Sequence, residues 1–262
     1  MKRLLTALAL IVFAVYLVFF APSSVFAAAA LLVGLLCYWE FSGLVVAHGI
    51  GRPGLVGVLL GSAIIFWPPQ IFWITPLLLA LELTLLLRRV NLREIIPEAG
   101  STILGAFYAF TPWRLAVDLR YQSIHLLFFA LALNWVGDSA AFYFGRHFGK
   151  HKLAPTISPG KSWEGAIASV TASTLFGLVY LGSVLPLLPS PIVAVIAILG
   201  NVTGQLGDLV ESSIKRGAGL KDSGNLLPGH GGVLDRLDSS MFAVPVVYSL
   251  YTFSYFLLTK TK

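Results

Sequence analysis

Long apolar segments separated by short polar breaks dominate the chain. A helix needs about 20 predominantly apolar residues to cross the hydrocarbon core of a bilayer, and most of these segments approach that length. We predict nine transmembrane helices, the third of them short, at residues 4–20, 25–47, 54–67, 70–87, 100–117, 123–144, 163–185, 191–210 and 237–258. The pattern therefore predicts an all-α polytopic membrane protein.

Composition agrees with this pattern. Of the 262 residues, 57% are hydrophobic and only 11% are charged, which is outside the range of soluble globular domains. Lys2 and Arg3 followed by an apolar run resemble a signal peptide, but the run exceeds the usual apolar core and another span follows at once. We therefore expect an uncleaved first helix. The single cysteine, Cys37, excludes an intrachain disulfide and a cysteine metal site.

The distribution of basic residues predicts the orientation. With the N-terminus in the cytoplasm and nine alternating spans, the external segments keep only four of the 18 basic residues, Arg114, Arg120, Lys260 and Lys262. This arrangement obeys the positive-inside rule. A net charge of +6 is then explained by a cytoplasmic face beside anionic lipid and needs no nucleic acid.

Acidic residues divide the chain into two parts. Seven of the twelve Asp and Glu residues lie between residues 138 and 238. We expect residues 1–122 to form N-terminal scaffold helices and residues 123–262 to form the catalytic transmembrane region, within one integrated membrane domain. The two largest cytoplasmic breaks, at 145–162 and 211–236, are too short to fold as separate domains.

The eighth span carries an unusual set of polar residues. Their spacing of four, three, four and three places them on one helix face: Asn201, Gln205, Asp208, Ser212 and Lys215. Hydrogen bonding between helices would explain the amide and hydroxyl groups. A carboxylate near hydrocarbon is expensive and usually marks a functional site, which favours this interpretation for Asp208.

Two further spans carry carboxylates near their cytoplasmic ends. Asn134 and Asp138 lie four residues apart on the sixth span, and Asp235 and Asp238 begin the ninth. An acidic residue at a helix N-terminus is favoured by the helix dipole, which accounts more easily for one aspartate than for two. We expect these carboxylates to approach Asp208.

The polar segment 215–238 reads KRGAGLKDSGNLLPGHGGVLDRLD. Carboxylates beside many cations suit Mg²⁺ and a polyphosphate, because Mg²⁺ takes one or two carboxylates and fills its other positions with phosphate and water. The cations that would neutralise phosphate are Lys215, Arg216, Lys221, His230 and Arg236. Six glycines would let backbone amides approach closely. A flexible linker is the simpler explanation for glycine, but linkers rarely alternate glycine with so many charges.

Gly160-Lys161-Ser162 resembles the end of a phosphate-binding P-loop. Pro155 stands where that motif requires glycine, and no parallel sheet is expected, so we reject it. Ser158-Pro159 fits the start of a short helix instead, with proline at the first helical position.

Residues 212–238, SSIKRGAGLKDSGNLLPGHGGVLDRLD, resemble the signature of the phosphatidate cytidylyltransferase (CDP-diacylglycerol synthase) family without a departure. Residues 138–155, DSAAFYFGRHFGKHKLAP, and 158–165, SPGKSWEG, resemble the second conserved block of that family. Gly160 departs from it, since a basic residue is expected there, and this weakens a phosphate role for that segment. The specific resemblance covers about residues 134–240.

The resemblance implies an enzyme that converts CTP and phosphatidic acid into CDP-diacylglycerol and pyrophosphate with Mg²⁺. It also implies a multi-pass protein of a prokaryotic cell (inner) membrane with its active site facing the cytoplasm, and it suggests a homodimer.

On this basis we assign roles to individual residues. The metal ligands are Asp208 and Asp235, with a two-metal site as one option and with Asp138, Glu211 and Asp238 as further candidates. The second ion would be Mg²⁺ or K⁺. The triphosphate is expected to bind Lys215, Arg216, Lys221, His230 and Arg236. The phosphatidate headgroup is expected at Arg146, Lys150, Lys152 and Lys161, which could instead close over CTP. Ser212 is also expected to bind substrate.

Other functions would share some of these features. A related CTP-dependent lipid kinase uses the same nucleotide. A CDP-alcohol phosphatidyltransferase would need a D-G-x-x-A-R motif, which is absent. An ion-coupled transporter also carries carboxylates inside the membrane, but it would predict internal inverted repeats and leaves the basic glycine-rich segment unexplained.

Overall fold

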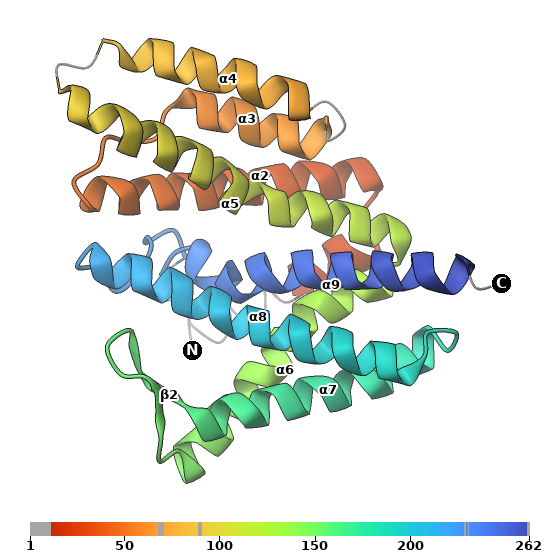
Figure 1. Cartoon of the computed structure of the whole chain (residues 1–262). Coiled ribbons are helices and arrows are strands. Elements are labelled where there is room, and N and C mark those ends of the chain that lie inside the picture. The colour runs from red at the N-terminus through yellow and green to blue at the C-terminus, as the bar shows by residue number, and fades with distance from the viewer. Residues whose placement is uncertain (1–11, 68–70, 89–90, 228, 230, 261–262) are drawn as a thin grey trace. The chain divides into compact units, whose positions relative to one another are not determined.

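The computed structural model describes residues 12–67, 71–88, 91–227, 229 and 231–260. These residues are mostly helical (Figure 1). The elements are α2 (Ser23–Ala47), α3 (Leu55–Phe66), α4 (Ile71–Leu86), the 3-10 helix η2 (Leu92–Glu94), α5 (Ile95–Gln122), α6 (Ile124–Phe148), β1 (Lys152–Ala154), β2 (Ser158–Ser162), α7 (Trp163–Val184), α8 (Ser190–Gly217) and α9 (Leu234–Lys260). Residues 12–19, before α2, are helical as well.

The chain forms two compact units. The first contains Met1–Val117 and Ile214–Arg236, and the second contains Asp118–Ser213 and Leu237–Lys262. The C-terminal end of α8, the following loop and the start of α9 therefore belong with the N-terminal helices. The predicted organisation as scaffold and catalytic parts of one integrated domain stays a prediction.

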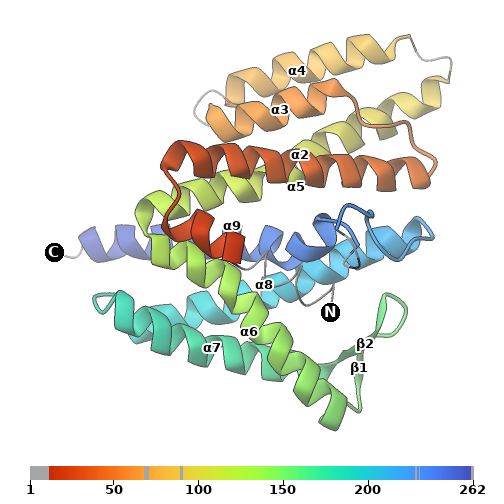
Figure 2. The same cartoon turned by 180° about the vertical axis from the view of Figure 1, so that it is seen from behind.

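In the first unit, α3 lies between α2 and α4 (Figure 1, Figure 2). Glycines allow these helices to approach α5 closely. The ring of Phe110 on α5 is fully buried, and a Cβ atom at Gly34 of α2 would lie 2.6 Å from it. Gly61 of α3 is pressed against the same ring. Small residues at such contacts are the usual way in which membrane helices pack.

In the second unit, α6 and α7 pack along each other, and the β1–β2 hairpin leads into α7 (Figure 2). Gly177 of α7 faces Phe129 of α6 and Ala197 of α8, and an added Cβ would lie 3.0 Å and 3.1 Å from their side chains. Ser162, the last residue of β2, caps α7 by accepting a hydrogen bond from the Gly165 amide at 3.2 Å.

The membrane character is confirmed, and the span prediction is confirmed in part. Five described helices, α2, α6, α7, α8 and α9, are long and apolar enough to cross a membrane. The segments predicted as the third and fourth spans form the shorter helices α3 and α4, of 12 and 16 residues. The fifth segment lies in α5, which is long but too polar to be counted with the five. Part of the predicted first span lies outside the described residues.

One expectation from the sequence was wrong. Ser158 and Pro159 do not start a helix: they lie in β2, where Ser158 pairs with Ala154. The hairpin is thus a small departure from an all-α fold, and a proline without an N–H group is tolerated on such an edge strand. The helix α8 continues to Gly217, as the predicted placement of Ser212 and Lys215 on its polar face requires.

Candidate active site

The polar residues of α8 lie on one face, as their spacing predicted. Gln205 Nε2 donates to Asn201 Oδ1 at 2.7 Å, and Ser212 Oγ donates to Asp208 Oδ1 at 3.2 Å. Asn201 is buried and hydrogen-bonds to Ser169 and Ser173 of α7. Its role is therefore helix packing, while Asp208 lies about two turns further along, where the polar face is partly exposed.

Asp208 pairs with a lysine of the hairpin. Its Oδ2 atom lies 2.6 Å from Nζ of Lys161 on β2. Asp138 of α6 interacts electrostatically with both groups. The fold of the second unit thus gathers two carboxylates and one ammonium from α6, β2 and α8, and we call Asp138, Lys161 and Asp208 the carboxylate cluster.

The other candidate ligands of this unit differ in their surroundings. The side chain of Glu211 is fully buried, whereas Asp138 is exposed. Asp238 Oδ1 accepts a hydrogen bond from the Ser239 amide at 2.6 Å, inside the first turns of α9. The predicted roles of Glu211 and Asp238 as metal ligands stay predictions.

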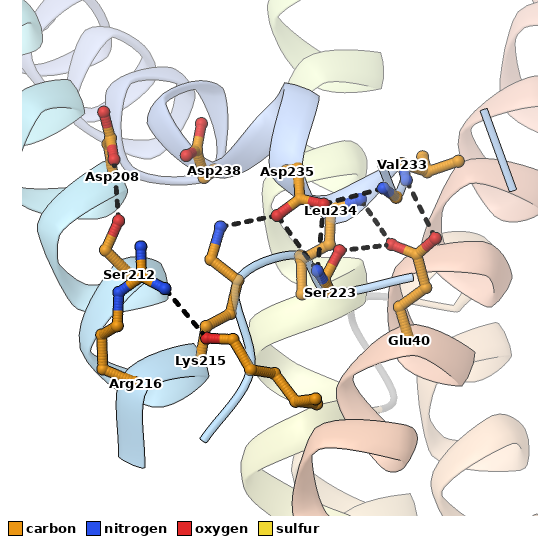
Figure 3. Close-up of polar contacts among 12 residues, drawn as sticks. Glu40, Asp208, Ser212, Lys215, Arg216, Ser223, Val233, Leu234, Asp235 and Asp238 are labelled. Atoms are coloured by element: carbon orange, nitrogen blue, oxygen red, sulfur yellow. Dashed lines mark hydrogen bonds and ion pairs between the residues drawn. The ribbon is translucent and has the colours of Figure 1, made fainter. Parts of the chain in front are cut away.

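In the first unit, Asp235 holds the loop between α8 and α9 (Figure 3). Its carboxylate accepts from Lys215 Nζ at 2.6 Å, from the Gly232 amide at 2.7 Å and from the Ser223 amide at 3.0 Å. The Lys215 and Asp235 side chains are only 10% and 6% exposed. This buried ion pair links the end of α8 to the start of α9, and we call the described residues 218–233 between them the signature loop.

A glutamate that sequence reasoning missed reaches the same loop (Figure 3). Glu40 of α2 is 3% exposed and accepts hydrogen bonds from Ser223 Oγ at 2.9 Å, the Val233 amide at 2.9 Å and the Leu234 amide at 2.8 Å. It was missed because segment 25–47 was assigned to the scaffold. The available signal was that Glu40 is the only charged residue of that apolar segment.

The remaining predicted cations are mostly exposed. Arg216 donates to the Leu220 carbonyl oxygen at 3.1 Å, while Lys221 and Arg236 have exposed side chains. His230 lies outside the described residues. In the second unit, Arg146, Lys150 and Lys152 are exposed near the hairpin, where His151 pairs with Glu164 at 2.7 Å.

The carboxylate cluster suits Mg²⁺ by its donor chemistry. Among the described residues no three or more His, Cys, Asp or Glu side chains are grouped to hold a metal ion. Mg²⁺ needs only one or two carboxylates when phosphate and water supply its other ligands. Asp138 and Asp208 meet that requirement, and the ammonium of Lys161 shows that a cation is accepted beside Asp208.

Asp235 fits a metal less readily. A carboxylate offers about four acceptor positions, and those of Asp235 already receive Lys215, Ser223 and Gly232. Asp208 and Asp235 belong to different compact units, each described by itself. The predicted two-metal site that contains both therefore stays a prediction.

A family model and several relatives identify the kind of protein to which this chain is similar. The model of the cytidylyltransferase family matches residues 1–254, almost the whole chain. The chain belongs to the cytidylyltransferase family. Membership confirms the resemblance first seen in residues 134–240 and extends it to the N-terminal helices, including α2 with Glu40.

Three similar proteins share the name phosphatidate cytidylyltransferase. A phosphatidate cytidylyltransferase of Staphylococcus saprophyticus is 37% identical over 202 residues, which cover 74% of this chain and 77% of the relative. Proteins of the same name from Staphylococcus haemolyticus and Staphylococcus epidermidis are 35% and 34% identical over 226 residues, covering 83% of this chain and 86% of each relative.

Proposed function

We propose that this chain is a phosphatidate cytidylyltransferase, which converts CTP and phosphatidic acid into CDP-diacylglycerol and pyrophosphate. The observation that carries the proposal is the similarity, over most of the chain, to cytidylyltransferases of that name. The buried Lys215–Asp235 pair and the exposed cations around the signature loop supply the chemistry that a triphosphate needs.

In this reaction an oxygen of the lipid phosphate attacks the α-phosphorus of CTP. A new P–O bond forms, the bond between the α-phosphorus and the bridging oxygen breaks, and pyrophosphate leaves with that oxygen. Catalysis then consists mainly of positioning and neutralising charge. A phosphomonoester with a second pKa near 6 is largely dianionic at neutral pH, so no residue of this chain needs to act as a general base.

The cations in and beside the signature loop, within residues 215–236, would hold the triphosphate. We assign this role to Lys215, Arg216, Lys221, His230 and Arg236, and the phosphatidate headgroup to Arg146, Lys150 and Lys152. Guanidinium groups bind phosphate through paired hydrogen bonds, whereas ammonium groups act as point charges. Lys161 would change partner, leaving Asp208 for a phosphate when substrate binds.

Asp138 and Asp208 would hold Mg²⁺, with Asp235, Glu211 and Asp238 as further candidates and a second Mg²⁺ or K⁺ as an option. When bound, the ion would neutralise charge on the phosphate oxygens. The two carboxylates would orient it, and Ser212, which donates to Asp208, would fix the direction of that carboxylate.

The membrane arrangement completes the proposal. Nine spans with the N-terminus in the cytoplasm would place the hairpin and the signature loop on the cytoplasmic side, where CTP is available. The acyl chains of phosphatidic acid would enter sideways between helices. Bacterial relatives favour a prokaryotic cell membrane, and a homodimer is the proposed assembly.

The proposal is tested with purified protein in mixed micelles containing phosphatidic acid. Pyrophosphate release is expected only when CTP, phosphatidic acid and Mg²⁺ are all present, together with one CDP-diacylglycerol for each pyrophosphate. Release of CDP instead would identify a lipid kinase. Absence of both products, with ion flux in liposomes, would identify a transporter.

A further inference from the structure

Glu40 is a buried carboxylate to which the proposed chemistry gives no role. It lies on α2, far before the signature loop in the sequence, yet both of its oxygen atoms accept hydrogen bonds at the end of that loop (Figure 3). Oε1 accepts from the Val233 amide, and Oε2 accepts from the Leu234 amide and from Ser223 Oγ. All of these groups belong to the first compact unit.

Two glycines of the loop are explained by this carboxylate. A Cβ atom at Gly224 would lie 2.7 Å from Glu40 Oε1, and one at Gly232 would lie 2.7 Å from Glu40 Cδ. Real side chains essentially never pack so closely. Gly224 and Gly232 therefore make room for Glu40, whereas the sequence suggested that these glycines make room for phosphate.

Glu40 and Asp235 hold the same short stretches of chain. Ser223 donates its hydroxyl to Glu40 and its amide to Asp235. The amide of Gly232 bonds to Asp235, and the next two amides bond to Glu40. Because Asp235 in turn pairs with Lys215, a shift of the loop away from Glu40 would move both members of the ion pair.

The contacts require a carboxylate and not merely a polar group of that size. Every group that reaches Glu40 here is a donor, so both oxygens must be acceptors. Glutamine has the same shape but replaces one acceptor with an NH₂ donor. In either orientation, that NH₂ would face an N–H or O–H donor of the loop, and a buried donor without an acceptor is costly.

We infer that Glu40 is a positioning residue for CTP binding: it fixes the signature loop against α2 and thereby sets Lys215 and Asp235 in place. The inference rests on the proposed function. It also gives α2, in the part of the chain expected to be scaffold, a direct influence on the nucleotide site.

The test compares Glu40→Gln with the unaltered protein in the pyrophosphate-release assay. We expect the KM for CTP to rise by at least about 10-fold, the lower end of the effect of removing a group that orients a metal ligand. The KM for phosphatidic acid should stay near that of the unaltered protein, because the bonds lost lie in the loop. A merely structural role would lower the folded fraction and leave both KM values unchanged.

Glu82→Gln is the matched control. Glu82 is also a buried glutamate of the first unit, but it accepts a hydrogen bond from Thr102 Oγ1 of α5, at 3.0 Å, instead of from the loop. It should leave the KM for CTP unchanged. If Glu40→Gln does not fold, Ser223→Ala provides the test. It removes one hydrogen bond to Glu40 and should still raise the KM for CTP. An unchanged KM for CTP overturns the inference, whereas an inactive unaltered protein overturns the proposed function.

Discussion

Lys161 and Lys215 each pair with an aspartate that was expected to bind metal, at the same distance of 2.6 Å. Burial distinguishes the two pairs. The Lys161 and Asp208 side chains are 27% and 30% exposed, whereas those of Lys215 and Asp235 are 10% and 6% exposed. A partly exposed pair is worth about 0.2–1 kcal/mol, but removing one partner of a buried pair costs roughly 3–5 kcal/mol. Asp208 can therefore exchange its partner more easily than Asp235.

This difference predicts distinct effects for two substitutions in the carboxylate cluster. Lys161→Met removes the cation that competes for Asp208, so the Mg²⁺ concentration for half-maximal activity should fall by about 1.4- to 5-fold, the equivalent of the pair's 0.2–1 kcal/mol. Asp208→Asn removes a proposed metal ligand and should lower turnover by more than about 100-fold. This exceeds the loss usual when a group that only hydrogen-bonds to a metal ligand is removed. Mg²⁺ titrations of pyrophosphate release measure both effects.

Glu94→Gln is the control for Asp208→Asn. Glu94 lies in η2 and bonds to Asn91, outside the carboxylate cluster. Its Mg²⁺ dependence should match that of the unaltered protein. Equal Mg²⁺ dependence for Lys161→Met and the unaltered protein would mean that Lys161 does not occupy the metal position.

At the scale of elements, close contacts between helices hold the carboxylate cluster in place. Gly137 lies next to Asp138 on α6, and it faces the buried group formed by Asn201, Ser169 and Ser173. A Cβ atom at this glycine would lie 2.8 Å from Ser173 Oγ and closer still to the other two side chains. The approach of α6 to α7 and α8 therefore depends on the absence of a side chain at residue 137.

We expect Gly137→Ala to destabilise the protein. Alanine favours a helix over glycine by about 1 kcal/mol, but overpacking a tight contact costs about 1–3 kcal/mol. Gly182→Ala on α7 is the matched control, because no atom lies within 4 Å of its added Cβ. Thermal unfolding in detergent, followed by tryptophan fluorescence, should show a lower midpoint for Gly137→Ala only. A midpoint at or above that of Gly182→Ala would contradict the packing argument.

At the scale of the whole molecule, the two compact units share α8 and α9, and each unit takes one end of both helices. The carboxylate cluster belongs to one unit, and the signature loop with Glu40 belongs to the other. Both include segments that the positive-inside rule assigns to the cytoplasm. The orientation of the spans is therefore the property on which the proposed access to CTP depends.

Cysteine labelling tests this orientation. The single native cysteine, Cys37, is fully buried and should remain unlabelled. Asn225→Cys in the signature loop and Thr156→Cys between β1 and β2 should react with an impermeant maleimide only after the cells are opened. Leu187→Cys, at a position 94% exposed between α7 and α8, should react in intact cells. Labelling of residue 225 in intact cells would contradict the proposed topology.

The sequence alone determined the membrane class, the family and the polar face of α8, because each depends on local order. Apolar length predicts a span, regular spacing places Asp208 and Ser212 on one face, and residues 212–238 carry a specific pattern. Local order also misled at Ser158, which was expected to start a helix and lies in a hairpin strand.

Only the tertiary structure decided which distant groups meet. Lys161 was expected to bind the phosphatidate headgroup or to close over CTP, and the fold also pairs it with Asp208. Glu40 is a single charge in an apolar segment, and nothing local shows that its partners are Ser223, Val233 and Leu234. Such contacts arise because a buried carboxylate must find donors wherever the folded chain supplies them, and sequence spacing does not encode that choice.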